Sequence, residues 1–233
     1  MKNKKKISVI IFVRNAFLTV FILGIVAAGS VAFRGYCMYA AALDRLPTAE
    51  AAREIRAGRG FTSISDLPDT YLKAVVCAED NRFYEHNGVD LVSIGRAFLR
   101  NIQIMSIVDG GSTITQQLAK NLYFTGEQEL SRKAAEMFMA WKLESDFSKD
   151  EILELYVNCI YFGSGCYSVG DASRCYFDKD PLDMSDWECT MLAGIPNAPS
   201  VYDLNVNPDL AMQRQRQVVN MMVRQNGLTE SQA

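Results

Sequence analysis

Residues 110–121 read GGSTITQQLAKN, a glycine pair and two hydroxyl residues followed by apolar side chains at helical spacing. Ile114, Leu118 and Leu122 recur every fourth residue, which predicts that they form the buried stripe of a helix. Thr113 and Gln116 have the spacing of a capping box at the start of that helix. The segment therefore predicts a flexible turn that leads into an amphipathic helix.

The polar side of this segment carries groups that bind anions or hydroxyl-rich ligands. Free backbone amides at a helix start, hydroxyls, side-chain amides and a lysine can all donate hydrogen bonds. An ordinary loop followed by a solvated helix face is the alternative. The candidate binding residues are Ser112, Thr113, Gln116, Gln117, Lys120 and Asn121, and the last four are expected to face away from the apolar stripe.

An upstream helix, predicted near residues 69–82, places a carboxylate on its apolar face. Glu79 shares that face with Leu72, Val75, Val76 and Phe83. Loss of water and repulsion from the neighbouring Asp80 should raise the pKa of Glu79 towards the range useful to a general base. A glutamate at the rim of a core helix that simply reaches solvent is the alternative.

A third segment, RKAAE, places Arg132 and Lys133 one helical turn before Glu136. Both cations can therefore approach the carboxylate. On its own this spacing is also typical of a surface ion pair, which stabilises a helix by well under ~1 kcal/mol.

The rest of the body also has helical periodicity and few strand signals, which predicts a mainly α fold. Two more capping boxes, Ser148 with Glu151 and Ser185 with Glu188, mark helix starts. The last helix is predicted between Pro208 and Gly227.

The N-terminal part is predicted to be a membrane anchor. Residues 16–33 contain no charge and are long enough to span a bilayer, and the cations of residues 1–15 place the N-terminus in the cytoplasm. A cleaved signal peptide is the alternative. The expected divisions are a basic cytoplasmic segment 1–15, a transmembrane signal anchor 16–36, an extracytoplasmic linker 37–66 and a helical domain 67–233.

Charge and composition limit the partners. Residues 1–33 carry five basic and no acidic side chains, whereas residues 34–233 carry 19 basic and 27 acidic ones, a net charge of −8. An acidic body lacks the basic surface that nucleic acids require. A hydrophobic content of 49% excludes a disordered chain.

The six cysteines are spaced without a CxxC pattern, and the chain has one histidine, so no metal site is predicted. Most lie in apolar helical stretches and are expected to be free thiols. The alternative in an oxidising compartment is a bridge, for which Cys159, Cys166 and Cys175 are the candidates.

Five motifs occur in a fixed order: EDNRFYEHNGVD from Glu79, GGSTITQQLAKN from Gly110, RKAAE from Arg132, KDEILELYVNCIYFGSGCYSVGDAS from Lys149 and ECTMLAGIPNAPSVYD from Glu188. Together they resemble the peptidoglycan glycosyltransferase domain, which occurs alone in monofunctional enzymes and at the front of class A penicillin-binding proteins. The resemblance covers about residues 67–227.

The resemblance implies a lysozyme-like fold with a large head lobe and a small, membrane-facing jaw lobe. An apolar run ahead of Gly110 suits the jaw: Ile102, Ile104, Met105, Ile107 and Val108.

The resemblance also implies the chemistry. Glu79 would be the general base that deprotonates the 4-hydroxyl of an acceptor lipid II sugar, and Glu136 a second essential acid. The donor would be the growing strand on undecaprenyl pyrophosphate, which Lys120 and Lys133 would hold. Asp80, Phe83 and Arg132 would join the substrate-binding residues listed above. No cofactor is expected to be required, although Mg²⁺ or Mn²⁺ at the pyrophosphate is compatible with this chemistry. Other cell-wall synthesis proteins are expected partners.

The sequence departs from the family at Gln128, where an arginine near the pyrophosphate is usual, and at Asp203, where an Asn-Pro pair often begins; we interpret Asp203 as packing drift. No SxxK motif is found, so a transpeptidase domain is not expected, and the chain is either a monofunctional enzyme or a fragment. A glycan-cleaving lytic enzyme and a non-catalytic membrane-tethered scaffold are the competing hypotheses.

Overall fold

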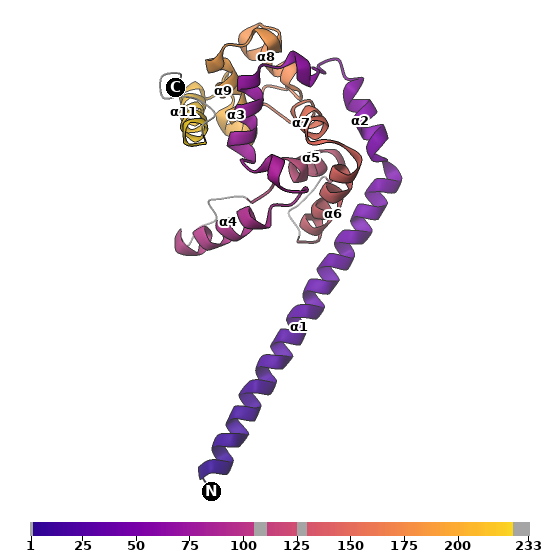
Figure 1. Cartoon of the computed structure of the whole chain (residues 1–233), viewed down its shortest axis with the longest axis vertical. Helices are drawn as coiled ribbons and strands as arrows, with labels where there is room; N and C mark the ends of the chain where they lie inside the picture. Colours follow the sequence, from indigo (N-terminus) through magenta and orange to yellow (C-terminus); the bar gives the residue numbers. More distant parts are fainter. Residues whose placement is uncertain (1, 105–110, 125–129, 226–233) are drawn as a thin grey trace.

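The computed structural model describes the backbone of residues 2–104, 111–124 and 130–225, and within these ranges the chain forms helices and no strand (Figure 1). The mainly α prediction is therefore confirmed. The longer helices, in chain order, are α1 (Lys2–Arg45), α2 (Thr48–Arg56), α3 (Asp69–Glu79), α4 (Leu91–Ile104), α5 (Ile114–Tyr123), α6 (Leu130–Asp146), α7 (Lys149–Val157), α8 (Val169–Phe177), α9 (Asp186–Gly194), α10 (Pro199–Tyr202) and α11 (Pro208–Arg224). Short 3₁₀ turns are η1 (Ile64–Asp66), η2 (Phe83–Glu85), η3 (Pro181–Asp183) and η4 (Ile195–Asn197).

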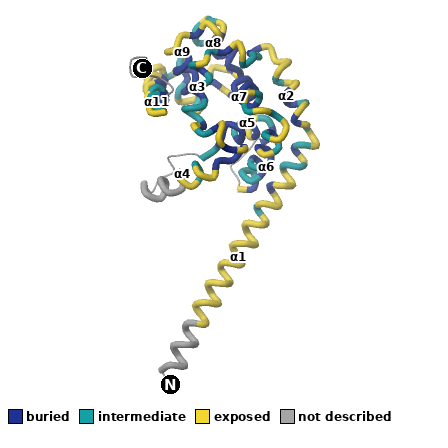
Figure 2. Tube along the Cα trace, viewed as in Figure 1, coloured by how far each residue is buried: buried dark blue, intermediate teal, exposed yellow. Residues whose placement is uncertain are grey.

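Helix α1 is a single helix that extends far from the body, and residues 11–30 are exposed (Figure 2). From Ile11 on it is long and apolar enough to cross a membrane. It continues past the predicted span to Arg45, and α2 then buries Ala51 and Ala52 in the core. The region predicted as a linker is thus helical over much of its length.

Two groups of helices build the body. Helices α3, α9 and α11 contact one another, and α5, α6 and α7 contact one another. Each group buries large apolar side chains, because the faces that meet carry them at helical spacing: Tyr71, Val75, Leu192, Val218 and Met222 in the first group, and Leu118, Met139, Leu143, Leu153 and Tyr156 in the second.

Helix α4 projects from the body on the side away from α2 (Figure 1). The apolar run predicted to form the jaw begins at the end of this helix with Ile102 and Ile104. Met105, Ile107 and Val108 lie outside the described residues, as does Gln128.

The predicted capping boxes are all present. Thr113 accepts from the Gln116 N–H at 3.1 Å, and the Thr113 N–H donates to Gln116 Oε1 at 3.2 Å. Ser148 and Ser185 make the same reciprocal pairs with Glu151 and Glu188. The last helix begins at Pro208, as predicted, while Gly227 lies outside the described residues.

Helix α3 ends at Glu79, three residues earlier than predicted. Asp80 leaves the helical conformation, with φ −159° and ψ 78°, and its carboxylate accepts the Ile114 N–H at 3.0 Å. This bond competes with continuation of the helix and ties its end to the start of α5.

Asp203 has a structural role that the interpretation as packing drift missed. Its Oδ2 accepts the Ser164 N–H at 2.7 Å, and Ser164 Oγ donates to Oδ1 at 3.0 Å. These bonds hold a turn in which Gly163 and Gly165 have φ of +85° and +80°. The carboxylate therefore stabilises a backbone conformation that favours glycine.

The six cysteines are free thiols, and Cys166 and Cys189 are buried. Burial raises the pKa of Cys159 to about 12, so this thiol is a poor nucleophile at neutral pH.

Replacing the N-cap Ser148→Ala should destabilise the protein by about 1 kcal/mol, because the Glu151 N–H at the start of α7 loses its acceptor. Urea unfolding followed by circular dichroism measures the change. Ser200→Ala, an exposed serine inside α10, is the matched control. Equal stability of the two variants would contradict the assigned cap.

Candidate active site

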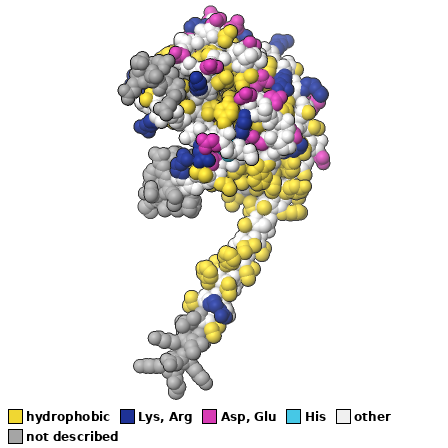
Figure 3. All heavy atoms as spheres, in the orientation of Figure 1, with side chains coloured by type: hydrophobic (Ala, Val, Ile, Leu, Met, Phe, Trp, Pro, Cys, Tyr) yellow, Lys and Arg dark blue, Asp and Glu magenta, His cyan; other side chains and the backbone are white. Residues whose placement is uncertain are grey.

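A cavity of about 220 Å³ lies where the end of α3, the start of α4, the turn before α5 and the end of α11 meet. Figure 3 shows basic and acidic side chains gathered on the body near the point where α4 leaves it. The polar side chains that line the cavity are Glu79, Asp80, Asn81, Asp90, Ser93, Arg96, Ser112, Thr113 and Gln225.

Glu79, the last residue of α3, is held by the side chain of Gln117 from α5. Gln117 Nε2 donates to Glu79 Oε2 at 2.8 Å, and the Tyr156 hydroxyl of α7 donates to Gln117 Oε1 at 3.1 Å. The Tyr156 bond fixes which end of the amide faces the carboxylate. The other oxygen, Glu79 Oε1, is buried and accepts no hydrogen bond from a described group. One carboxylate oxygen of Glu79 thus has unused hydrogen-bonding capacity.

Burial raises the pKa of the Glu79 carboxyl above its ordinary value. The hydrogen bond from Gln117 and the charge of Arg214 oppose the rise, and the charge of Asp80 adds to it. The predicted rise is confirmed, with loss of solvent as its largest cause. Since a base of raised pKa binds a proton more strongly, the environment suits Glu79 to proton abstraction near neutral pH.

The RKAAE segment forms a second charged group on α6. Glu136 is 2% exposed; Lys133 Nζ lies 2.9 Å from its Oε2 and Arg132 3.6 Å from its Oε1. Lys133 also donates to Ser112 Oγ at 2.7 Å, and Ser112 lines the same cavity as Glu79. The simple surface ion pair is therefore excluded, because the carboxylate is buried and Lys133 reaches the cavity wall.

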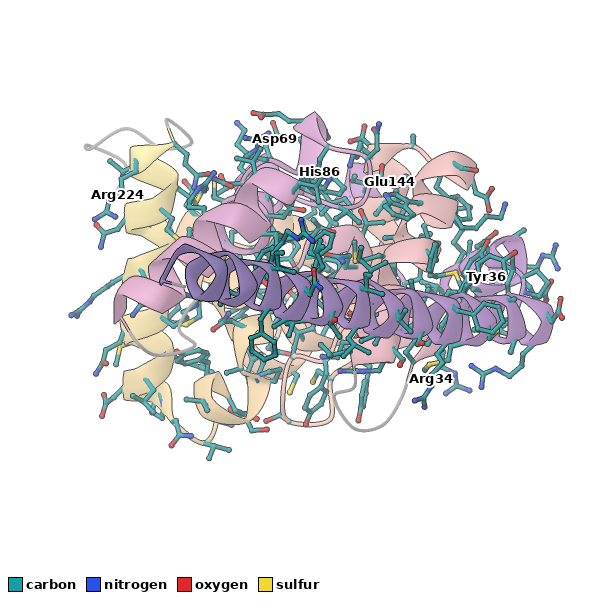
Figure 4. The ribbon with its side chains drawn as sticks, turned by 90° about the horizontal axis from the view of Figure 1, so that it is seen from below. Arg34, Tyr36, Asp69, His86, Glu144 and Arg224 are labelled. Atoms are coloured by element: carbon teal, nitrogen blue, oxygen red, sulfur yellow. The ribbon has the colours of Figure 1, made fainter. Side chains whose placement is uncertain are left out.

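Asp80 lines the cavity, but its oxygens are engaged. Both lie near His86 Nε2, at 3.1 and 3.0 Å, and Oδ2 also accepts the Ile114 N–H. Burial raises the pKa of Asp80, while His86, the Ile114 N–H and Lys149 oppose the rise. Figure 4, viewed from below, shows His86 on the same side of α1 as Glu144, the ion-pair partner of Lys149. Asp80 thus organises the wall of the site.

Two predicted binding residues belong to the interior. Phe83 is fully buried and packs under Lys149 Nζ, 4.4 Å from the ring centroid, so it contributes to the core rather than to the cavity surface. Gln116 was expected on the polar face, but it is 1% exposed and its carbonyl caps α5. Capping required it to turn inward at the helix start.

The remaining predicted residues lie at or near the cavity. Thr113 lines it and is buried. Lys120 and Asn121 are exposed one turn beyond Gln117 on the same side of α5, but they do not line the cavity.

Several residues that contribute to the site were not predicted from the sequence, and three of them come from elements that hold none of the predicted site residues or act on Glu79 or its partner. Tyr156 orients Gln117, Arg96 lines the cavity, and Arg214 of α11 acts on Glu79 through its charge. Only Tyr156 lay within a quoted motif, and no local pattern indicates that its hydroxyl reaches α5.

Comparison with known proteins shows the family of this chain. A family described as Transglycosylase matches residues 48–223. The chain belongs to the transglycosylase family. Its lysozyme-like helical fold is the one expected from the motifs, and the family match begins ahead of the predicted boundary at residue 67.

Several penicillin-binding proteins are similar to this transglycosylase chain. Penicillin-binding protein 1A of Neisseria lactamica is 46% identical over 174 residues, which are 75% of this chain and 22% of that protein. Penicillin-binding protein 1F of Bacillus subtilis (strain 168) is 42% identical over 184 residues, 79% of this chain and 26% of that protein. The chain thus spans about a quarter of the length of these relatives.

Replacing Gln117→Leu should move the acidic limb of the pH–rate profile to higher pH. The Gln117 hydrogen bond lowers the pKa of Glu79, so its loss raises that pKa and the ionised base appears only at higher pH. The dependence of kcat/KM of the transglycosylase reaction on pH measures the shift.

Gln213→Ala, on the exposed side of α11, is the control and should leave the profile unchanged. A limb that stays in place in Gln117→Leu would show that Glu79 is not the titrating base.

Proposed function

We propose that this chain is a membrane-anchored peptidoglycan glycosyltransferase that polymerises lipid II into glycan strands. The observation that carries the proposal is that Glu79, whose buried Oε1 accepts no hydrogen bond from a described group, lines a cavity whose wall also contains Ser112, the partner of Lys133. Glu79 as a base in the cavity wall, and Lys133 as a cation bonded to that wall, suit the transfer of a sugar from a charged leaving group.

The acceptor hydroxyl requires a base because a neutral alcohol is a weak nucleophile. In the proposed step Glu79 Oε1 takes the proton of the 4-hydroxyl while the alcohol oxygen bonds to the anomeric carbon of the donor strand. Gln117 holds the other carboxylate oxygen in place, so Oε1 is the oxygen left without a hydrogen-bond partner. Attack on the face opposite the leaving group gives a β-1,4 link with inversion.

The bond that breaks joins the anomeric carbon to undecaprenyl pyrophosphate. A pyrophosphate leaves without protonation if its charge is compensated, so cations matter more here than a second acid. Lys133 and Arg132 supply that charge beside the cavity, and Lys120 is the further candidate on α5. Glu136 holds both α6 cations in position. The step requires no cofactor, and a divalent cation would bind the oxygens of the pyrophosphate itself.

A lipid-linked substrate is consistent with the N-terminal helix, which is long and apolar enough to anchor the chain in the same membrane. A polyprenyl chain stays in the bilayer, and an enzyme anchored by α1 shares that surface with it. We propose a single pass with the N-terminus in the cytoplasm and the body outside, where other cell-wall synthesis proteins would be partners.

Replacing Glu79→Gln should lower polymerisation on the order of 10²–10⁴-fold, because the amide cannot accept the proton. A gel of products from labelled lipid II measures strands, with moenomycin, the donor-site inhibitor of the family, as the inhibited control. Glu54→Gln, which replaces an exposed glutamate of α2, should remain active.

The same variant should be more stable at pH 8 than the unchanged chain. A carboxylate whose pKa is raised in the folded state costs stability as pH rises through that pKa, and glutamine removes this cost. Thermal unfolding at pH 8 and pH 4 should show a gain that shrinks at the lower pH.

These assays separate the competing functions. A lytic enzyme would clear a suspension of purified cell wall and would not consume lipid II, and a scaffold would do neither.

Replacing Lys133→Gln should lower kcat by about 100-fold, comparable to removal of one donor from a transition-state charge site. Lys142 lies on the same helix and forms an ion pair with Asp146 at the surface. The control variant Lys142→Gln should therefore keep full activity. Steady-state rates on labelled lipid II measure both. Similar activity of the two variants would show that the α6 cations do not serve the leaving group.

A further inference from the structure

The N-terminal helix α1 is in unusually close contact with α6, the helix that carries Arg132 and Lys133. A Cβ atom placed on Gly35 of α1 would lie 2.5 Å from Ala134 Cβ, 2.9 Å from the Ser131 carbonyl oxygen and 3.0 Å from the Ala135 N. Only glycine permits this approach of α1 to α6. Gly24 and Gly29, in the outer part of α1, have nothing within 4 Å of such an atom.

Aromatic rings extend this contact along both helices. Tyr36 meets Phe138 edge-on at 5.7 Å between ring centroids, Tyr39 lies 6.1 Å from Phe138, and Phe138 lies 5.7 Å from Trp141. Tyr36 and Trp141 remain about half exposed. Half-exposed tyrosine and tryptophan are typical of the boundary between membrane and water.

The position of this contact along α1 matches the outer edge of a bilayer. Arg14 and Arg34 bound the uncharged run, and the 19 residues between them correspond to about 30 Å of helix, the thickness of the hydrocarbon core. Gly35 follows Arg34 directly. Figure 4 shows Arg34 and Tyr36 on different sides of α1 close to the body, and Figure 3 shows apolar side chains continuing from α1 onto the adjoining underside of the body.

The residues that α6 presents to Gly35 alternate with those of the candidate site. Ser131, Ala134 and Ala135 face α1, whereas Lys133 and Glu136 reach towards the cavity through Ser112. The contact with the anchor and the cationic group therefore occupy the same turns of one helix. A rigid connection at this point determines how far the cations stand from the membrane.

We propose that the Gly35 contact sets the height of the catalytic cavity, so that Arg132 and Lys133 stand at the level of lipid phosphates. The inference rests on the proposed function, since it concerns a pyrophosphate that cannot leave the membrane surface. Gly35 is then a positioning residue, and α1 holds the body at a fixed distance from the membrane instead of acting as a flexible tether.

The first test variant moves the body away from the membrane and keeps the contact between Gly35 and α6. Insertion of Glu-Ala-Ala-Lys between Phe33 and Arg34 extends α1 by about 6 Å in residues that stay outside the hydrocarbon. Gly35→Leu removes the close contact instead. The same insertion after Lys2 and the substitution Gly29→Leu are the matched controls.

Each full-length variant is assayed on polyprenyl lipid II in liposomes and on a short-chain, water-soluble analogue in detergent. Insertion after Phe33 and Gly35→Leu should each lower the liposome rate at least 10-fold and change the analogue rate less than twofold. Both controls should keep both rates.

Trp141 gives a readout of height that is independent of activity. In a Trp187→Phe background it is the remaining tryptophan, since the chain contains two. Headgroup-level spin-labelled lipids should quench its fluorescence in the unchanged chain and quench it less after the insertion at Phe33.

Three results would overturn the inference. If the variants kept their rates in liposomes, α1 would be a flexible tether. If the rates on both substrates fell equally, the Gly35 contact would be needed to form the active site and not to position it relative to the membrane. If quenching of Trp141 did not change after the insertion, the distance between the body and the membrane would not have changed. An unmodified chain inactive on both substrates would overturn the proposed function, and this inference with it.

Discussion

The hydrogen bond from Gln117 to Glu79 is the contact on which the site depends, because it crosses between the two groups of helices. Glu79 ends α3 in one group, and Gln117 and its partner Tyr156 belong to the other. Burying a carboxylate is costly unless it is hydrogen-bonded, and here one oxygen is bonded and the other is not. The fold tolerates that cost because apolar packing on both sides keeps the helices in place. A base with an unsatisfied oxygen is thus a consequence of how the groups meet.

The two glutamates of the site differ through their neighbours. Glu79 has a neutral amide as its direct partner, with Arg214 acting only through its field, whereas Glu136 lies between Lys133 and Arg132. The first environment favours uptake of a proton, and the second favours a fixed ion-paired group that orders cations. Carboxylates placed in contrasting surroundings commonly divide catalytic roles in this way. The geometry is therefore better suited to deprotonating an alcohol beside a charged leaving group than to a pair of carboxylates that exchange roles.

Features set by neighbouring residues were predictable, and features set by tertiary contacts were not. Spacing alone located the capping boxes, and periodicity placed Glu79 on an apolar face, because helix periodicity and capping are local. The inward turn of Gln116, the burial of Phe83 and the Asp203 bonds to the turn at Ser164 depend on segments far apart in the chain. The close contact of Gly35 could not be predicted from its local sequence, because its partners on α6 lie about a hundred residues away in the chain.

The acidity of the body explains why a tight helix contact is needed at all. Residues 34–233 carry a net charge of −8, so an anionic lipid surface repels the body rather than attracting it. In the function that we propose, its site nevertheless has to meet a substrate whose pyrophosphate lies at that surface. A flexible tether would leave the body free to move away, and no general basic surface would bring it back. In our proposal, contact through Gly35, together with the ring cluster of Tyr36, Phe138 and Trp141, uses close packing and apolar interaction instead of charge to keep Arg132 and Lys133 near the membrane.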